Sequence, residues 1–204
     1  MQLLLIRHGL PVPIEGHADP ELDEIGHAQS QHLAEYLASE RIDVIYTSPM
    51  HRARQTAAPL AERLGMEPIV EPDVAESDKD GTSYVPVEQL KAAGDPRWRE
   101  AVAVSDWAEE REPLDAFHER VMAGIERMVD AHAGQNVAVF CHGGVIARYT
   151  ATILELPWER TGFFYPLYTS VTRVAASSSS GIRSILTVNE TAHLRGTGLP
   201  TGAL

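Results

Sequence analysis

The sequence predicts an α/β fold: a three-layer α/β/α sandwich with a mostly parallel central sheet and a small inserted cap. Three runs, at residues 3–6, 42–46 and 137–141, predict strands, and the first, with four large apolar residues in a row, is typical of a strand buried on both faces. A segment with helical spacing of apolar residues comes after each run. Strands that alternate with helices in this way favour a parallel sheet covered by helices on both sides.

The helices that follow the first two strands have predictable limits. Apolar residues recur at helical intervals over residues 25–37. The next helix is expected to start with Pro49 in its first turn and to run to about Leu64, where Gly65 would end it. A short strand is expected within residues 66–70, directly after this helix.

The length of 204 residues fits one domain over residues 1–204. Between about residues 71 and 110 the pattern becomes irregular and rich in Asp, Glu, Pro and Gly, apart from a short helix at residues 87–93. Such stretches between regular units are typically insertions over a functional site, so we expect a cap here. Regular structure then resumes with an amphipathic helix at residues 113–133 and an antiparallel hairpin near the C-terminus.

Composition narrows the choice of partners and compartment. Lys and Arg number 17 against 29 Asp and Glu, a net charge of −12, which disfavours nucleic acid and anionic membranes as partners. No apolar run approaches the length of a membrane span, and the chain starts directly in a core strand. The single cysteine, Cys141, is interpreted as a small buried hydrophobe. We therefore expect a cytoplasmic protein.

Charged and imidazole side chains follow the predicted strands where each strand ends. Arg7 and His8 end the first strand, His142 follows the strand at residues 137–141, and Arg52 lies in the first turn of a helix. Ligands of open α/β sheets bind at the carboxyl ends of the strands, so these four side chains are expected in one pocket. Two guanidinium groups and two helix N-termini around two imidazoles best match a phosphate.

Four motifs stand in order along the chain: Arg7-His8-Gly9, Ser48-Pro49-Met50-His51-Arg52-Ala53-Arg54-Gln55-Thr56, the midway carboxylate of Glu76, and His142-Gly143-Gly144. In this order and spacing, they resemble the histidine phosphatase superfamily, the phosphoglycerate-mutase-like proteins. The resemblance spans nearly the whole chain. Further segments that resemble the family are residues 22–26, before the first helix, and residues 189–194, near the C-terminus.

A neutral imidazole is a good nucleophile toward phosphorus, and flanking arginines disfavour its protonation. The chemistry and the resemblance both assign this role to His8. Arg7, Arg52 and His142 would hold the phosphoryl oxygens, helped by the backbone N–H of Gly143.

The resemblance makes Glu76 the general acid that protonates the leaving oxygen, with Asp78 and Asp80 as alternatives in the same acidic segment. The loop that begins at Leu10 is expected to form part of the pocket wall, and His17 in this loop is a candidate substrate contact.

We expect no cofactor and no metal. A divalent cation would be repelled by the guanidinium groups, and the sequence lacks ligand spacing near His8 and His142. The partner implied is a small phosphorylated substrate, and a homodimer is the expectation taken from similar proteins.

Two departures from the family pattern favour a phosphatase over a mutase. Leu10 and Pro11 replace the usual acidic and hydroxyl residues after Arg-His-Gly, and the loop has no Asn. The segment after Glu76 also lacks the usual Trp-Glu-Gly. The prediction is a metal-independent phosphomonoesterase that acts through a phosphohistidine. A phosphoglycerate-mutase-type isomerase and a non-catalytic phosphate- or phosphoprotein-binding module are the alternatives.

Overall fold

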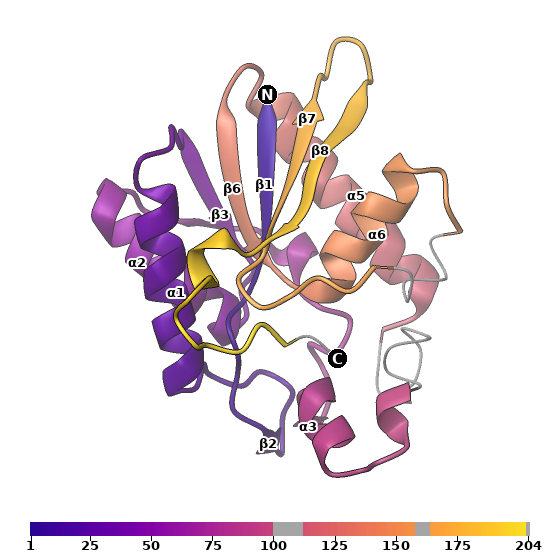
Figure 1. Ribbon diagram of the computed structural model, residues 1–204. Helices are drawn as coiled ribbons and strands as arrows, with labels where there is room; N and C mark the ends of the chain where they lie inside the picture. The colour runs from indigo at the N-terminus through magenta and orange to yellow at the C-terminus, as the bar shows by residue number, and fades with distance from the viewer. Residues whose placement is uncertain (100–111, 158–163, 203–204) are drawn as a thin grey trace.

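The computed structural model describes residues 1–99, 112–157 and 164–202, and it contains one six-stranded sheet between two layers of helices (Figure 1). The strand order is β4-β3-β6-β1-β7-β8. Neighbours from β4 to β1 are parallel, whereas β7 is antiparallel to both β1 and β8. The strands are β1 (Gln2–Arg7), β3 (Val44–Thr47), β4 (Ile69–Val70), β6 (Asn136–Cys141), β7 (Val171–Ala176) and β8 (Arg183–Glu190).

Each face of the sheet is covered by two helices. The helices are α1 (Glu24–Leu37) and α2 (His51–Leu64) on one face, and α5 (Leu114–Ala131) and α6 (Gly143–Ile153) on the other. Successive side chains of β1 point to opposite faces of the sheet. Leu3 and Leu5 pack with α5 and α6. Leu4 and Ile6 pack with α1 and α2. This explains the uninterrupted apolar run in β1 and confirms the three-layer sandwich.

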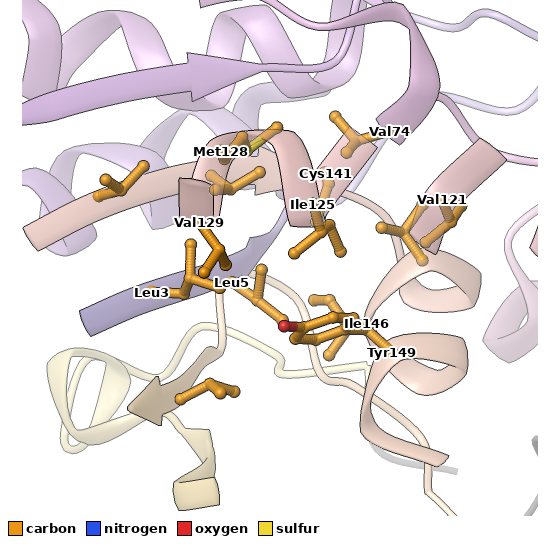
Figure 2. Close-up of a cluster of buried hydrophobic side chains, with 14 of the residues drawn as sticks. Leu3, Leu5, Val74, Val121, Ile125, Met128, Val129, Cys141, Ile146 and Tyr149 are labelled. Atoms are coloured by element: carbon orange, nitrogen blue, oxygen red, sulfur yellow. The ribbon is translucent and has the colours of Figure 1, made fainter. Parts of the chain in front are cut away.

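The core between the sheet and α5 is shown in Figure 2. Ile125, Met128 and Val129 of α5 lie against Leu3 and Leu5 of β1, and all five side chains are buried. Their spacing along α5 is helical, which is why the amphipathic pattern identifies this helix from sequence. The packing fixes β1 firmly from its first residues to the point where the polar Arg7 and His8 begin.

The two central parallel strands send their connections to opposite faces. The chain leaves β1 toward α1, whereas it leaves β6 directly into α6 on the other face. Adjacent strands whose connections diverge leave a crevice at their carboxyl ends, the usual position of ligand sites in α/β sheets. The fold thereby places the ends of β1 and β6, with His8 and His142, beside one another.

Two very short strands were not predicted. Within the expected loop after β1, β2 (Ile14–Glu15) pairs with β5 (Ser83–Tyr84), and α3 (Val87–Ala92) follows. Figure 1 shows β2 and α3 at the end of the molecule toward which β1 runs. Two residues carry too few side chains for an alternating pattern, so periodicity did not reveal β2 and β5. The equally short β4 does lie within the strand expected at residues 66–70.

The start of the expected cap belongs to the core. The one-turn helix η1 (Pro72–Val74) packs against α5, and the Val74 side chain is buried in the cluster of Figure 2. The segment from β5 to α3 lies farther out, and residues 100–111 of the expected cap are outside the described residues. The single-domain boundary and the cap remain predictions.

The second helix begins later than the proline suggested. Met50 has extended backbone with ψ of 140°, so α2 starts at His51 and Pro49 precedes it. Asp19 accepts a hydrogen bond from the His51 N–H, and the Ser48 hydroxyl accepts one from the Met50 N–H. These side chains satisfy donors that the helix leaves unpaired. The C-terminus agrees with expectation, since Gly65 has a left-handed φ of 63°.

None of the helices in the described part of the chain is both long enough and apolar enough to cross a bilayer.

Candidate active site

The carboxyl ends of β1 and β6 bring two imidazole rings together. The ring centroids of His8 and His142 are 5.2 Å apart, and both side chains are almost fully buried. Arg7 and Arg52 are buried beside them and act electrostatically on both rings. The four side chains that the sequence predicted in one pocket therefore do lie together.

A hydrogen bond fixes the orientation and tautomer of the His8 ring. Its Nδ1 lies 2.7 Å from the carbonyl oxygen of Gly9. A carbonyl can only accept, so Nδ1 carries the proton, and Nε2 of the neutral ring keeps its lone pair. Burial lowers the pKa of His8 well below its usual value, and the charges of Arg52 and Arg7 lower it further. His8 is thus uncharged at neutral pH.

Aromatic rings and a carbonyl position the Arg7 guanidinium. Its Nη1 donates a 2.7 Å hydrogen bond to the Pro166 carbonyl, and its Cζ lies 4.1 Å from the ring centroid of Tyr168 and 5.2 Å from that of Tyr165. A cation over an aromatic face gains about 0.5–2 kcal/mol. These contacts leave Nε without a hydrogen-bond partner among the described residues.

Arg52 is held by groups from the flanking segments. Nη1 donates to the Ala18 carbonyl at 2.8 Å, Nη2 donates to Asp78 Oδ1 at 3.1 Å, and Cζ lies 4.8 Å from the Tyr84 ring centroid. Burial alone would lower the pKa of Arg52, but Asp78 and other acidic neighbours raise it overall. Asp78, a sequence candidate for the general acid, therefore forms an ion pair with this arginine, and Asp19 forms a second, longer one at 3.8 Å.

His142 is positioned by the segment after β3. Its Nε2 and the Ser48 hydroxyl are joined by a 2.8 Å hydrogen bond. Burial, with the charge of Arg52 and further basic neighbours, lowers the pKa of His142 well below its usual value. Its Nδ1 has no hydrogen-bond partner within the described ranges.

Glu76 lies at the N-terminus of α6. Its Oε2 accepts a 2.8 Å hydrogen bond from the Gly144 N–H, and its Oε1 accepts one from the Ser77 N–H. Glycine at position 144 leaves room for this carboxylate, because an added Cβ would lie 2.3 Å from Glu76 Oε1 and the carboxylate would have to move. Gly143, the first residue of α6, lies against Arg7, since a Cβ there would be 3.6 Å from Arg7 Nε. The predicted carboxylate thus shares a helix N-terminus with the arginine.

The turn that carries His8 is packed tightly on α1. An added Cβ at Gly9 would lie 2.7 Å from the Gly26 carbonyl oxygen, and one at Gly26 would lie 2.1 Å from the Leu10 carbonyl oxygen. The Gly9 N–H also donates to the Thr56 hydroxyl at 3.0 Å. Only glycines allow this approach, which explains the glycine in each of the two sequence motifs.

The other two predicted contacts lie in the loop after β1. Leu10 is buried, and its backbone N–H donates to Gln29 Oε1 at 2.8 Å. His17 is exposed, and its Nδ1 accepts a hydrogen bond from the Asp19 N–H at 3.2 Å. The described structure does not bring His17 into contact with the four central side chains. Substrate contacts by Leu10 and His17 stay predictions.

Several residues of the site escaped sequence reasoning. The irregular segment before β7 carries Tyr165 and Tyr168, and Asn189 of β8 holds it by accepting from the Leu167 N–H at 2.7 Å and donating to the Tyr165 carbonyl at 2.9 Å. The alternating pattern predicts a strand over residues 168–176, which includes Tyr168 but gives it no role in the site, and no periodic pattern marks Tyr165; the strand itself starts only at Val171. The one sequence feature that pointed to this region was the family resemblance of residues 189–194, which start at Asn189.

All of the unpaired polar atoms nearest His8 can donate a hydrogen bond, and among them the hydroxyls of Tyr165 and Tyr168 can also accept one. Arg7 Nε and Arg52 Nε are buried donors without partners in the described part of the chain, and His142 Nδ1 can also donate. Buried donors are costly unless a ligand satisfies them, and the ligand that satisfies several converging donors is an oxyanion. The described residues form no group of three or more His, Cys, Asp or Glu side chains placed to hold a metal ion.

The chain is similar to known proteins over most of its length. The sequence model of the histidine phosphatase superfamily (branch 1) matches residues 3–191. Phosphoserine phosphatase 1 of Hydrogenobacter thermophilus is 33% identical over 149 residues, 70% of this chain and 71% of that protein. Phosphoglycerate mutase-like protein 4 of Arabidopsis thaliana is 30% identical over 155 residues, 71% of this chain and 67% of that protein.

A comparison with solved structures also finds a phosphatase with a similar fold. A mycobacterial glucosyl-3-phosphoglycerate phosphatase, solved with inorganic phosphate, matches with a TM-score of 0.73 at 26% identity, covering 94% of this chain and 98% of that one. The match of the family model over nearly the whole chain, together with the shared fold, shows that this chain belongs to branch 1 of the histidine phosphatase superfamily.

Proposed function

We propose that the protein is a metal-independent phosphomonoesterase that acts through a phosphohistidine intermediate on a small phosphorylated substrate. One observation carries the proposal: the buried, uncharged His8 has its Nδ1 proton bound to the Gly9 carbonyl, which leaves Nε2 with its lone pair on a ring that the charges of Arg52 and Arg7 keep unprotonated. The names of similar proteins support hydrolysis, since they include phosphoserine phosphatase and glucosyl-3-phosphoglycerate phosphatase.

In the first step the lone pair of His8 Nε2 attacks phosphorus, and the bond from phosphorus to the ester oxygen breaks. The charge on the three equatorial oxygens is stabilised by Arg7, Arg52 and His142, whose unpaired donors are fixed before the substrate arrives. The Gly143 N–H at the start of α6 adds a further donor.

Glu76 is assigned the proton transfers. Its carboxyl group protonates the leaving oxygen, so the alcohol departs neutral. The resulting carboxylate then accepts a proton from the water that attacks phospho-His8, and this step releases inorganic phosphate and restores the free ring. Asp78 is less suited, because its Oδ1 already accepts the hydrogen bond from Arg52. Glu76 instead lies at the helix N-terminus that would receive the phosphate.

The test is hydrolysis of an aryl phosphate by the wild type and His8→Ala, each with EDTA present. Turnover that persists with EDTA and disappears in His8→Ala supports the proposal. No turnover by the wild type on the aryl ester or on a panel of phosphorylated metabolites would exclude it. Movement of phosphate between hydroxyls, stimulated by a bisphosphate, would indicate a mutase, and phosphate binding without any turnover would indicate a binding module.

A further inference from the structure

One carboxylate in the described structure is buried without any partner. Glu88 lies in the first turn of α3, and both of its carboxylate oxygens are inaccessible to solvent. Neither oxygen accepts a hydrogen bond from a described residue, and Glu88 takes part in none of the ion pairs among those residues. A buried carboxylate costs several kcal/mol unless a donor or a cation satisfies it.

The position of Glu88 connects it to the site. Its charge acts on Arg7 and on Tyr168, which stacks on Arg7. Tyr84, four residues earlier on β5, stacks on Arg52. The segment from β5 to α3 thus contacts the Arg52 guanidinium through Tyr84, and its acidic residue, Glu88, acts on Arg7 through its charge.

The unsatisfied charged groups of this region are of two kinds. Those of Arg7 and Arg52 are donors, whereas those of Glu88 are acceptors; the unpaired hydroxyls of Tyr165 and Tyr168 are neutral and can be either. The donors complement the oxygens of a phosphate. The acceptors complement a cationic donor, and they belong to a different structural element from the arginines. A single molecule that satisfies both the arginine donors and the Glu88 oxygens must therefore carry a phosphate at one end and a cation at the other.

We propose that Glu88 is a specificity-determining residue that binds an ammonium group on the leaving group, so that the enzyme selects phosphomonoesters of amino alcohols. The inference rests on the proposed phosphatase function and names its substrate class. The ammonium supplies the N–H donors that the buried carboxylate lacks, and the resulting charge-assisted bond is stronger than one between neutral groups.

The experiment compares matched esters that differ in charge but hardly in size. Phosphoethanolamine is paired with n-propyl phosphate, and 4-aminobutyl phosphate with n-pentyl phosphate. The two pairs test two distances between the phosphate and the ammonium group. For the wild type we expect kcat/KM to favour the amino ester of at least one pair by roughly 10- to 100-fold, the range for one charge-assisted hydrogen bond.

Glu88→Gln keeps the shape and removes the charge, so the preference should fall by about tenfold or more while hydrolysis of the alkyl esters is retained. Glu88→Asp retains a carboxylate and should keep more of the preference than Glu88→Gln. Glu62→Gln removes an exposed carboxylate from α2 and should leave the ratio unchanged.

Wild-type ratios near one for both pairs would overturn the role of Glu88, as would an equal loss on amino and alkyl esters in Glu88→Gln. In either case, continued hydrolysis of the alkyl esters shows that the phosphatase function itself stands. Absence of turnover on all four esters and on the aryl phosphate would instead remove the phosphatase function, and this inference with it.

Discussion

The Nδ1 atom of His8 is bound to the carbonyl oxygen of the next residue, Gly9, at 2.7 Å. The acceptor belongs to the backbone and is held in place by the close approach of Gly9 to Gly26. The tautomer of the candidate nucleophile is therefore set by the turn after β1 rather than by a neighbouring carboxylate, and a ring held in this way needs no general base.

His8→Asn separates this positioning from nucleophilicity. An asparagine amide can still donate to the Gly9 carbonyl, but it offers no nitrogen lone pair at the position of Nε2. We expect turnover of an aryl phosphate to fall about a thousandfold or more, whereas binding of inorganic phosphate, measured by calorimetry, changes less than about tenfold. Loss of phosphate binding would show that the ring itself holds the anion.

Ser48→Ala removes the hydroxyl that positions His142. The buried Nε2 would lose its 2.8 Å hydrogen bond, at a cost of about 1–3 kcal/mol. We expect kcat/KM for an aryl phosphate to fall roughly tenfold or more. Ser178→Ala, at an exposed position of the turn between β7 and β8, serves as the control and should match the wild type. Equal rates for Ser48→Ala and the wild type would contradict a positioning role for Ser48.

Gly144→Ala tests the place of Glu76. The new Cβ would lie 2.3 Å from Glu76 Oε1 and would displace the carboxylate from the start of α6. We expect kcat to fall as far as in Glu76→Gln, with no further loss in the double variant, since both changes remove the same group. Gly143→Ala, whose Cβ meets Arg7 Nε at an ordinary 3.6 Å, should retain more activity. Additive losses in the double variant would argue that Glu76 acts elsewhere.

Asn189→Ala should release the segment that carries the tyrosines stacked on Arg7. Asn189 has a left-handed φ of 60° and makes two hydrogen bonds to this segment. Losing both bonds and straining the backbone is expected to lower the free energy of unfolding by about 2–3 kcal/mol and to raise KM. Asn189→Gly tolerates the φ but lacks the bonds, so its stability should lie between those of Asn189→Ala and the wild type. Thermal unfolding and steady-state kinetics measure both effects, and an unchanged KM in both variants would refute the link to Arg7.

Buried histidines predict acid sensitivity of the fold. The pKa values of His8 and His142 are well below 6.5, and burial lowers that of His193 to about 4. The unfolded chain therefore binds more protons than the folded one below about pH 6.5, so stability falls as the pH decreases and is flat with respect to these groups above that value.

The free energy of unfolding from urea titrations should drop by up to about 1.4 kcal/mol per pH unit for each such histidine. His8→Asn removes one of them and should reduce the slope between about pH 6.5 and 5 accordingly. An identical slope in wild type and variant would mean that His8 is protonated in the folded protein.

Much of the fold could be predicted because the central elements carry strong local patterns. The runs in β1 and β6 are buried on both faces, and the polar residues that end them mark the carboxyl edge of the sheet. For the same reason, His8, Arg7, Arg52 and His142 were found from sequence. The supporting contacts were not, because Tyr165 and Tyr168 lie in an irregular segment whose position depends on a distant residue, Asn189.

The region over the site is the part that sequence patterns describe least well. The pairing of β2 with β5 involves two residues on each strand, and the ion pair of Asp78 with Arg52 joins separate segments. Tertiary contacts determine such features, and the local propensity of the sequence does not predict them. The burial of Glu88 belongs to the same group, because its neighbours are set by how α3 packs and not by the residues beside it in the chain.

The most direct test of the account is to locate the phosphoryl group during turnover. The enzyme would be mixed with substrate, quenched in alkali, which preserves phosphohistidine, and digested for mass spectrometry, with Glu76→Gln included to slow hydrolysis of the intermediate. The account predicts a phosphoryl group on Nε2 of His8, in larger amount in Glu76→Gln than in the wild type. A phosphoryl group on another side chain, or full turnover by His8→Asn, would contradict it.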